Sequence, residues 1–349
     1  MRRDAGLAIA FVKRPPHSRP SRIAKIYLSI PLSSREDSMA EVVLDAKGLT
    51  KTYGDMNAVD NLDLQVFKGE VYSMLGPNGA GKTTTVEILE GLRNPTSGTA
   101  KVFGFDVQKD YDKVRSRVGV LPQTFEPWDR IKPPEAIEYW AGLFGRKISN
   151  REIRGLLEMV DLAHKDEVWG ERLSGGEKRR LGIAMALVGE PELIFLDEPT
   201  TGLDPQARRG LWEIIHALGD AGKTVFLTTH YLEEAENLAD RVSIMNKGKI
   251  VVSGSPEELV NLYGGGTHVV LKGAGEEGVA ALEKLGYKST FHNRDVTVHV
   301  PALMRTKDFM AQINQSGIAY KDFETMRPSL EDVFFNMVGG RMEEGVLKQ

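Results

Sequence analysis

The segment GPNGAGKT at residues 76–83 constrains the fold of this chain more than any other feature. It stands between the apolar run VYSML and the helix-forming run TTTVEILEGL, which is the strand–loop–helix context of a phosphate-binding loop. Glycines let backbone N–H groups approach phosphates closely, and the dipole of the following helix adds positive potential. The sequence therefore predicts an α/β core with a phosphate site at the end of a strand.

Within this loop the side chains have separate predicted tasks. Lys82 can reach the β- and γ-phosphates of a nucleotide, and the Thr83 hydroxyl can ligate Mg²⁺. The Thr84 hydroxyl is expected to point toward the α-phosphate. A glycine-rich turn without a ligand is the alternative, and the agreement of pattern and context disfavours it. The candidate nucleotide-binding residues of the loop are Gly76, Asn78, Gly79, Gly81, Lys82, Thr83 and Thr84.

Two further runs end in residues that suit hydrolysis. LIFLDEP places Asp197 and Glu198 at the carboxyl end of a buried strand, where open α/β sheets bind ligands. Asp197 is a candidate for the Mg²⁺ shell, and Glu198 is a candidate to polarise the attacking water. His230 ends the run TVFLTTH, 32 residues after Glu198. One βαβ unit has about this length, so we expect adjacent strands and a contact from His230 to the γ-phosphate. A solvated acidic pair and a purely structural histidine are the alternatives.

A second possible anion site begins at LSGGEKRR, residues 173–180. Ser174 and Glu177 have the spacing of a capping box, which would be sufficient to start a helix. Capping alone does not require Gly175 and Gly176, whereas open N–H groups at a helix start suit an anion. The helix is expected to run to about Val188, roughly 20 Å. Its start would then lie far from the chain's own phosphate loop, so we infer that it serves a nucleotide on another molecule.

The remaining pattern predicts two folded parts. Strands are expected at 42–53, 62–75, 192–199 and 224–230, helices at 151–162 and 205–220, and a hairpin at 241–254 that turns at Lys247–Gly248. After the glycines at 264–266, the order βαββαβ over about 267–325 predicts a small split-βαβ, ferredoxin-like α+β domain. A last helix is expected within 328–340. Residues 1–40, basic and rich in proline, are predicted to be a disordered leader or an incorrectly assigned start, with Met39 opening the domain.

Composition excludes several classes of function. The net charge of −4 argues against a nucleic-acid partner. With no cysteine, the chain has no disulfide, no thiolate zinc site and no cysteine nucleophile. No stretch approaches the ~20 apolar residues that span a bilayer, so work at a membrane would require another subunit to cross it.

Over residues 41–258 the sequence resembles the ATP-binding subunit of an ABC transporter. The resemblance rests on five motifs in this order: the phosphate loop, LSGGE, LIFLDEP, TTGLDP and TTH. The resemblance implies a P-loop NTPase with a mixed sheet, Walker A and Walker B motifs, and a helical insertion at about 124–190. It also implies that two copies pair head to tail, each ATP lying between one copy's phosphate loop and the other's signature residues. Those residues are Ser174, Gly175, Gly176 and Glu177. Many family members have Gln where this chain has Glu177.

The resemblance assigns three further roles. Tyr53 matches the aromatic that stacks on adenine, and an ordinary strand-end tyrosine is the alternative. Gln123 matches the glutamine that senses the γ-phosphate and Mg²⁺, and Asp204 matches the aspartate that communicates across the dimer. Residues 124–145 match the region that docks the membrane subunit. Trp128, Trp140 and Phe144 are either contacts of that dock or part of a helix core.

The run PSLEDVF at 328–334 resembles the tail of the drug-resistance and multidrug branch, whose members work with a separate membrane protein. This favours an ATP- and Mg²⁺-dependent ATPase that powers export, held at the inner face of the membrane by permease subunits. The predicted parts are 1–40, an ATP-binding domain at 41–258, and an accessory domain at 259–349 that either stabilises or regulates the dimer. The alternatives are a soluble ABC-type ATPase without a transport role and a phosphate-loop kinase, which LSGGE and TTH oppose.

Overall fold

The computed structural model describes residues 41–301 and 304–348, so the prediction for residues 1–40 falls outside the described part. The central sheet has six strands in the order β10-β9-β3-β8-β7-β6. Neighbours from β9 to β6 are parallel, and β10 is antiparallel to β9. The strands are β3 (Val71–Leu75), β6 (Val118–Leu121), β7 (Leu193–Asp197), β8 (Thr224–Thr229), β9 (Arg241–Asn246) and β10 (Lys249–Gly254).

A second, antiparallel sheet has the order β2-β1-β4-β5. Its strands are β1 (Val42–Tyr53), β2 (Met56–Phe67), β4 (Ser97–Val102) and β5 (Phe105–Asp106). The run LDLQVFKGEVYSML is divided between the two sheets, because the chain turns at Lys68–Gly69 and Gly69 has φ 75°. A backbone with positive φ favours glycine and interrupts a strand.

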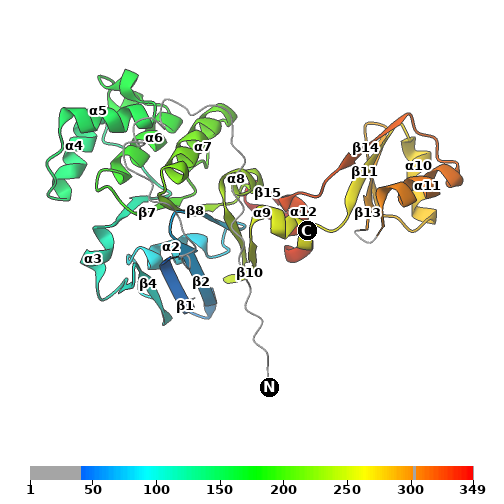
Figure 1. Cartoon of the computed structure of the whole chain (residues 1–349), viewed down its shortest axis with the longest axis horizontal. Coiled ribbons are helices and arrows are strands. Elements are labelled where there is room, and N and C mark those ends of the chain that lie inside the picture. The colour runs from blue at the N-terminus through cyan, green and yellow to red at the C-terminus, as the bar shows by residue number, and fades with distance from the viewer. Residues whose placement is uncertain (1–40, 302–303, 349) are drawn as a thin grey trace.

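Helices cover both faces of the central sheet (Figure 1). They are α2 (Lys82–Leu89), α3 (Tyr111–Arg115), α4 (Pro133–Leu143), α5 (Asn150–Met159), α6 (Gly175–Ala186), α7 (Pro205–Asp220), α8 (Leu232–Leu238) and α9 (Pro256–Tyr263). The helix predicted at 205–220 has those bounds. The helix predicted at 151–162 ends three residues earlier, and the helix after LSGGE ends at Ala186.

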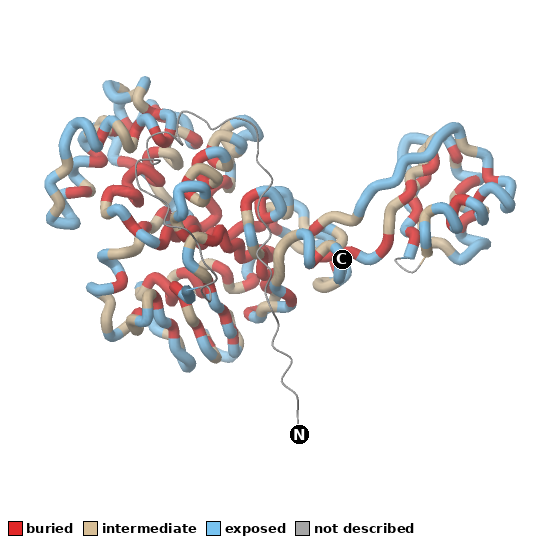
Figure 2. The backbone as a smooth tube through the Cα atoms, in the orientation of Figure 1, coloured by how far each residue is buried: buried red, intermediate tan, exposed pale blue. Residues whose placement is uncertain are grey.

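The two faces of the sheet carry separate hydrophobic clusters because side chains alternate along each strand. Phe195 and Phe226 point into the cluster that contains Val86 of α2. Leu196 and Leu227 point into the cluster that contains α4, α5, α6 and α7. Buried residues concentrate in the interior of the larger part, where the sheet and helices pack together (Figure 2). The phosphate-loop helix α2 and the helix α6 therefore lie on opposite faces of the sheet.

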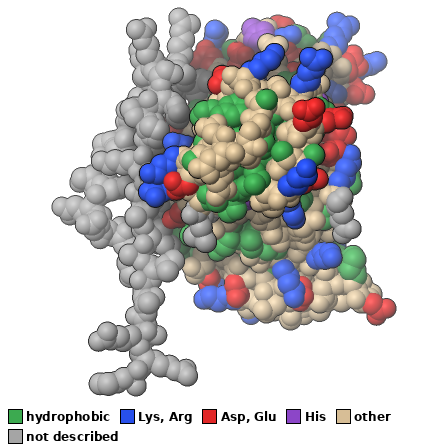
Figure 3. All heavy atoms as spheres, turned by 90° about the vertical axis from the view of Figure 1, so that its right-hand side faces the viewer, with side chains coloured by type: hydrophobic (Ala, Val, Ile, Leu, Met, Phe, Trp, Pro, Cys, Tyr) green, Lys and Arg blue, Asp and Glu red, His purple; other side chains and the backbone are tan. Residues whose placement is uncertain are grey.

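Residues 267–326 form a separate unit at the right of Figure 1 with its own hydrophobic cluster. Its elements are β11 (Thr267–Lys272), α10 (Gly275–Lys284), β12 (Ser289–His292), β13 (Asp295–Val300), α11 (Thr306–Ser316) and β14 (Asp322–Met326). This is the predicted element order, and the antiparallel sheet has the order β12-β13-β11-β14. Seen from this end, hydrophobic side chains gather with charged ones around them (Figure 3).

The chain then returns to the larger part. Helix α12 (Leu330–Val338) buries Leu330, Val333 and Phe334 in a cluster with Leu75 of β3 and Leu259 of α9. A terminal hairpin follows, formed by β15 (Arg341–Glu343) and β16 (Val346–Lys348). The predicted last helix is thus present; its apolar face packs against the larger part, while its Asp332 contacts His268 of β11 at 2.9 Å. Within residues 41–301 and 304–348, no helix is long and apolar enough to cross a membrane.

Candidate functional site

The phosphate loop connects the end of β3 to the start of α2, in the predicted strand–loop–helix arrangement. Gly81 caps α2 in a left-handed conformation with φ 105°, and a Cβ there would lie 2.1 Å from the Ala58 carbonyl oxygen. A Cβ on Gly76 would lie 2.3 Å from the Met245 carbonyl oxygen. Both positions require glycine because the loop is pressed against neighbouring backbone. Asn78 and Gly79 are exposed on the outside of the loop.

Lys82 folds back over the loop and is only 4% exposed. Its ammonium donates to the Gly76 carbonyl at 2.7 Å and the Pro77 carbonyl at 3.2 Å. The same nitrogen lies 3.1 Å from Glu198 Oε1. Burial lowers the pKa of Lys82, and the charge of Glu198 opposes that shift.

Glu198 is the residue on which the predicted catalytic groups converge. Its Oε2 lies 3.1 Å from His230 Nδ1, accepts from the Thr201 hydroxyl at 3.0 Å, and lies 3.4 Å from Gln123 Nε2. Strands β7 and β8 are adjacent and parallel, as the spacing predicted, so the two strand ends meet. Glu198 also has φ 46°, an uncommon conformation for a non-glycine residue that clusters at functional sites.

The charge state of Glu198 follows from these partners. Burial alone raises the pKa of the carboxyl, but the His230 hydrogen bond and the Lys82 ammonium outweigh it and lower the pKa to about 2. Glu198 is therefore ionised at neutral pH while Lys82 stays beside it.

The residues around Asp197 fit a magnesium ion. Asp197 is buried, accepts a hydrogen bond from the Thr228 hydroxyl, and is also hydrogen-bonded to Thr83. Burial raises the pKa of Asp197, while these hydroxyls and the Lys82 charge oppose the shift. Mg²⁺ prefers hard oxygen ligands and takes few from the protein, since phosphates and waters supply the others. A paired carboxylate and hydroxyl beside a phosphate loop meet that requirement.

The signature segment forms the predicted capping box at the start of α6. The Ser174 hydroxyl accepts from Glu177 N at 3.3 Å, and Ser174 N donates to Glu177 Oε2 at 2.8 Å. Ser174 and Gly175 are exposed, whereas Gly176 is buried. A Cβ on Gly176 would lie 2.9 Å from Ala207 Cβ of α7. Gly176 thus has a packing reason to be glycine, which the sequence analysis did not foresee.

Tyr53 and Asp204 lie outside this contact network. The Tyr53 ring is 40% exposed at the end of β1, with Lys51 Nζ 5.3 Å and Arg93 Cζ 5.6 Å from its centroid. The Asp204 side chain caps α7 by accepting from Gln206 N and Ala207 N, both at 2.9 Å. Thr84 is half-buried on α2.

Arg179 is a site residue that sequence reasoning missed. It lies on α6 five residues after Ser174, and its guanidinium donates to the Pro122 carbonyl at 2.9 Å and to the Gln123 carbonyl. The side chain therefore ties the signature helix to the Gln123 segment of the same molecule. The basic run KRR was the available signal, although nothing in it distinguishes Arg179 from its neighbours.

The predicted docking region carries exposed aromatic side chains. Trp128 and Tyr139 are each 51% exposed and stack edge to face at 4.9 Å, and Phe144 is 41% exposed. Trp140 instead packs against the hydrophobic cluster on that face of the sheet. Of the three predicted aromatic residues, two lie at the surface and one belongs to the helix core.

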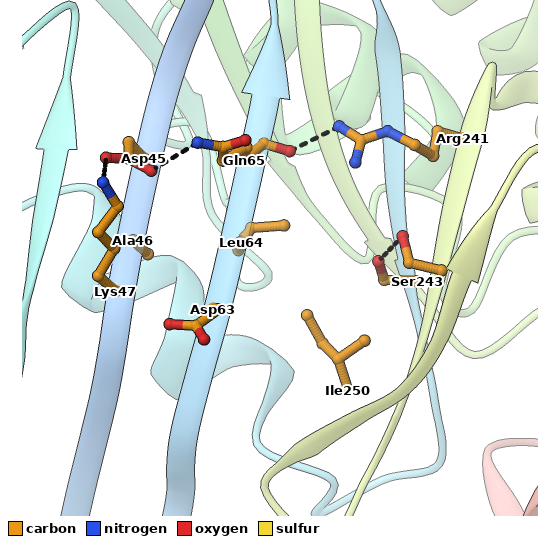
Figure 4. Close-up of a pocket in the computed structure, with 10 residues that line it drawn as sticks. Asp45, Ala46, Lys47, Asp63, Leu64, Gln65, Arg241, Ser243 and Ile250 are labelled. Carbon is orange, nitrogen blue, oxygen red and sulfur yellow. Dashed lines mark hydrogen bonds and ion pairs between the residues drawn. The ribbon is translucent and has the colours of Figure 1, made fainter. Parts of the chain in front are cut away.

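A hollow of about 490 Å³ lies between the two sheets and contains none of the predicted site residues (Figure 4). Asp45 and Gln65 line one side, and Arg241 and Ser243 line the other. The Arg241 guanidinium is already paired with Glu70 and donates to the Gln65 carbonyl. The predicted nucleotide-binding and catalytic residues lie instead at the phosphate loop and the ends of β7 and β8.

Comparison with known proteins agrees with this geometry. The ABC transporter family profile matches residues 59–201. The chain is 38% identical to the daunorubicin resistance ATP-binding protein DrrA3 of Streptomyces coeruleorubidus, over 86% of this chain and 97% of that protein. It is 37% identical to the Nod factor export ATP-binding protein I of Cupriavidus metallidurans, over 86% and 99% of the two chains. Identity to the linearmycin resistance ATP-binding protein LnrL of Bacillus subtilis is 32%, over 86% and 100%.

Solved structures share the larger part of the fold. An ATP-binding subunit of an ABC transporter aligns with a TM-score of 0.57 and 27% identity, over 64% of this chain and 93% of that one. An ATP-binding cassette solved as a post-hydrolysis dimer with ADP and inorganic phosphate aligns with a TM-score of 0.55 and 26% identity, over 61% and 98%.

Proposed function

The chain belongs to the ATP-binding subunits of ABC transporters, in the branch that powers export by ATP hydrolysis, and from this premise we propose how its residues carry out that work. Lys82 and the N–H groups of residues 76–83 hold the phosphates of ATP, and Glu198 orients the water that attacks the γ-phosphate. The observation that carries this proposal is the convergence of Lys82, His230 and Gln123 on the Glu198 carboxylate.

Nucleotide binding changes the partners of Lys82. In the structure its ammonium pairs with Glu198. When ATP binds, the phosphate oxygens present a stronger negative charge and attract the Lys82 ammonium away from Glu198. The Glu198 carboxylate then loses a neighbouring cation, so its pKa rises and it becomes a better proton acceptor. His230, on the other oxygen of Glu198, holds the carboxylate in place and contacts the γ-phosphate.

Thr83, Asp197 and Gln123 would hold Mg²⁺, which when bound neutralises charge on the phosphate oxygens. The buried Asp197 carboxylate, with hydroxyls beside it, supports this assignment. Tyr53, exposed at the end of β1, stacks on adenine.

A second copy of the chain completes each site. Helix α6 packs on the face of the sheet opposite to α2, so its exposed start at Ser174 and Gly175 is directed to a nucleotide held by another molecule. The free N–H groups of a helix start favour the anionic γ-phosphate. Asp204, exposed at the start of α7, contacts the partner copy.

The membrane partner is a permease, and the exposed Trp128, Tyr139 and Phe144 surface of the helical insertion is its dock. Exposed aromatic groups of this kind mark protein contacts. Arg179 links the signature helix to the Gln123 segment, so nucleotide-driven closure is transmitted toward that surface. The chain thus works on the cytoplasmic side of the membrane, and residues 41–258 are its ATP-binding domain.

The relatives named for daunorubicin resistance, linearmycin resistance and Nod factor export support export as the task of this chain. A soluble ABC-type ATPase without a transport role was the alternative considered from the sequence, and the export names of these relatives oppose it. The 267–326 unit is an accessory domain of the exporter.

Light scattering of the Glu198→Gln protein tests the proposal. ATP with Mg²⁺ should convert monomer to dimer, because slow hydrolysis preserves the ATP that bridges the two copies. Adding Ser174→Arg should abolish the shift while leaving ATP bound. A dimer that persists with Ser174→Arg, or no dimer despite bound ATP, would contradict the head-to-tail arrangement.

A further inference from the structure

The terminal hairpin is anchored beside the phosphate loop. Its Met342 and Leu347 pack against the cluster that contains Leu75, the residue immediately before the loop, and Phe334 of α12. The turn Glu344–Gly345 has positive φ at both residues, 48° and 79°, as a tight two-residue hairpin requires. The hairpin tip is therefore held in place from two sides.

The tip contacts the loop through Gly345. Asn78 N, in the third position of GPNGAGKT, donates to the Gly345 carbonyl oxygen at 2.7 Å. Gly345 is buried although both its neighbours are exposed. A Cβ on Gly345 would lie 2.7 to 2.9 Å from the side-chain atoms of Asn78. No side chain fits between the turn and the loop, so the contact depends on glycine.

This contact uses a group that the loop needs for its ligand. Phosphate loops hold their anions with successive backbone N–H groups. When a carbonyl oxygen accepts a hydrogen bond from one of these N–H groups, that group is no longer available to a phosphate. With that donor occupied, the loop has one N–H group fewer for the phosphates, and this opposes nucleotide binding.

We propose that the 341–348 hairpin competes with the phosphates of a nucleoside triphosphate for Asn78 N–H, so that Gly345 sets the affinity of the site for ATP. This inference rests on the proposed function of the phosphate loop. In this proposal the PSLEDVF segment positions the hairpin, because its buried Leu330, Val333 and Phe334 lie in the cluster against which the hairpin packs. By reciprocity, a bound nucleotide weakens the docking of the hairpin.

The test compares glycine variants of the full chain. Gly345→Ala introduces a Cβ against Asn78 and should dislodge the tip. Gly339→Ala is the matched control, because Gly339 also has positive φ, 83°, but a Cβ there meets nothing within 4 Å. A chain that ends at Gly340 is a second variant that removes the competitor altogether. The probe is a fluorescent, non-hydrolysable ATP analogue with Mg²⁺, titrated at equilibrium.

Gly345→Ala and the shortened chain should each bind the analogue about 3- to 10-fold more tightly than the unaltered chain, the value of one hydrogen bond. Gly339→Ala should bind as the unaltered chain does. Hydrogen exchange in 341–348 should accelerate when the analogue is bound. Unchanged or weaker binding by both Gly345→Ala and the shortened chain would overturn the competition. If Lys82→Ala binds as tightly as the unaltered chain, the proposed function itself has failed.

Discussion

Lys82 and Glu198 form a buried ion pair across the candidate site, with 3.1 Å between Lys82 Nζ and Glu198 Oε1. Both side chains are at most 5% exposed. The pair joins the start of α2 to the residue that follows β7, so the residue proposed to hold phosphate contacts the residue proposed to activate water. Under that proposal, ATP binding separates the two side chains before hydrolysis.

Replacing Glu198 by Gln should destabilise the chain at pH 7 by about 3 kcal/mol, because the buried Lys82 ammonium loses its ion-pair partner. Since the folded-state pKa of Glu198 is about 2, this stabilisation is complete above pH 5 and lost as pH falls from about 4.5 toward 2. Urea unfolding of both proteins, from pH 7 to the lowest pH at which both fold, measures the difference. A difference that grows on acidification would refute the assignment.

Glu90 should make stability depend on pH in the direction opposite to that expected for Glu198. Burial first, and then the charges of Asp197 and Glu87, raise the pKa of Glu90 to about 8. The folded chain therefore keeps a proton that the unfolded chain releases, and stability falls by up to about 1.4 kcal/mol per pH unit between pH 4.5 and 8. Glu90→Gln should remove this loss, so its stability relative to wild type should rise from pH 5 to pH 8.

Denaturant unfolding at four pH values checks the Glu90 prediction. Glu158→Gln is the control, because Glu158 pairs with Arg154 at the surface and does not contribute to the shift of Glu90, and it should retain the wild-type slope. Parallel slopes for wild type and Glu90→Gln would show that Glu90 does not carry the effect.

The two glycines of the signature segment should respond differently to alanine. Gly176→Ala places a Cβ 2.9 Å from Ala207 Cβ and should cost about 1–3 kcal/mol through overpacking. At Gly175 the nearest atom to a new Cβ, Leu203 Cδ2, is 3.6 Å away. Gly175→Ala should therefore be neutral or stabilise α6 by up to about 1 kcal/mol. Thermal unfolding of the two variants distinguishes them, and equal Tm values would contradict the packing argument.

Arg179→Ala should loosen the Gln123 segment. Loss of the hydrogen bonds to the Pro122 and Gln123 carbonyls should raise amide exchange in residues 123–126 by about 10-fold, the value of one to two hydrogen bonds. Arg180→Ala is the control, because Arg180 pairs with Asp161 instead. Exchange that rises equally in both variants would point to general loosening of α6.

The main residues of the candidate site could be predicted from the sequence, because they lie at the ends of strands and helices whose order along the chain is known. Glu198 and His230 meet because β7 and β8 are neighbours, and βαβ spacing predicts neighbouring strands. Ser174 and Glu177 are local partners, so their capping box was also predictable. The contacts that could not be predicted form between segments that are distant in the sequence and meet only in the folded chain. Arg179 and the Gly176–Ala207 contact arise only when α6 packs against other segments, and no local pattern encodes either one.

In the C-terminal part, too, the local elements were predictable from the sequence and the long-range contacts were not. The strand and helix runs after residue 266 predicted the βαββαβ order of the 267–326 unit, which the structure has. The hairpin at 341–348 was missed because its strands have three residues each, too few for a periodic signal. The hydrogen bond from Asn78 to Gly345 joins residues 267 positions apart, a separation that only the folded chain brings together.

Helices α9 and α12 pack on each other within one cluster, and Asn336 Nδ2 donates to the Tyr263 carbonyl at 2.9 Å. The chain thus leaves the larger part at one helix and re-enters it at a helix in contact with the first. The 267–326 unit is therefore an insertion whose two ends leave and rejoin the larger part at neighbouring helices, and the His268–Asp332 hydrogen bond fastens its first strand to the second of these helices.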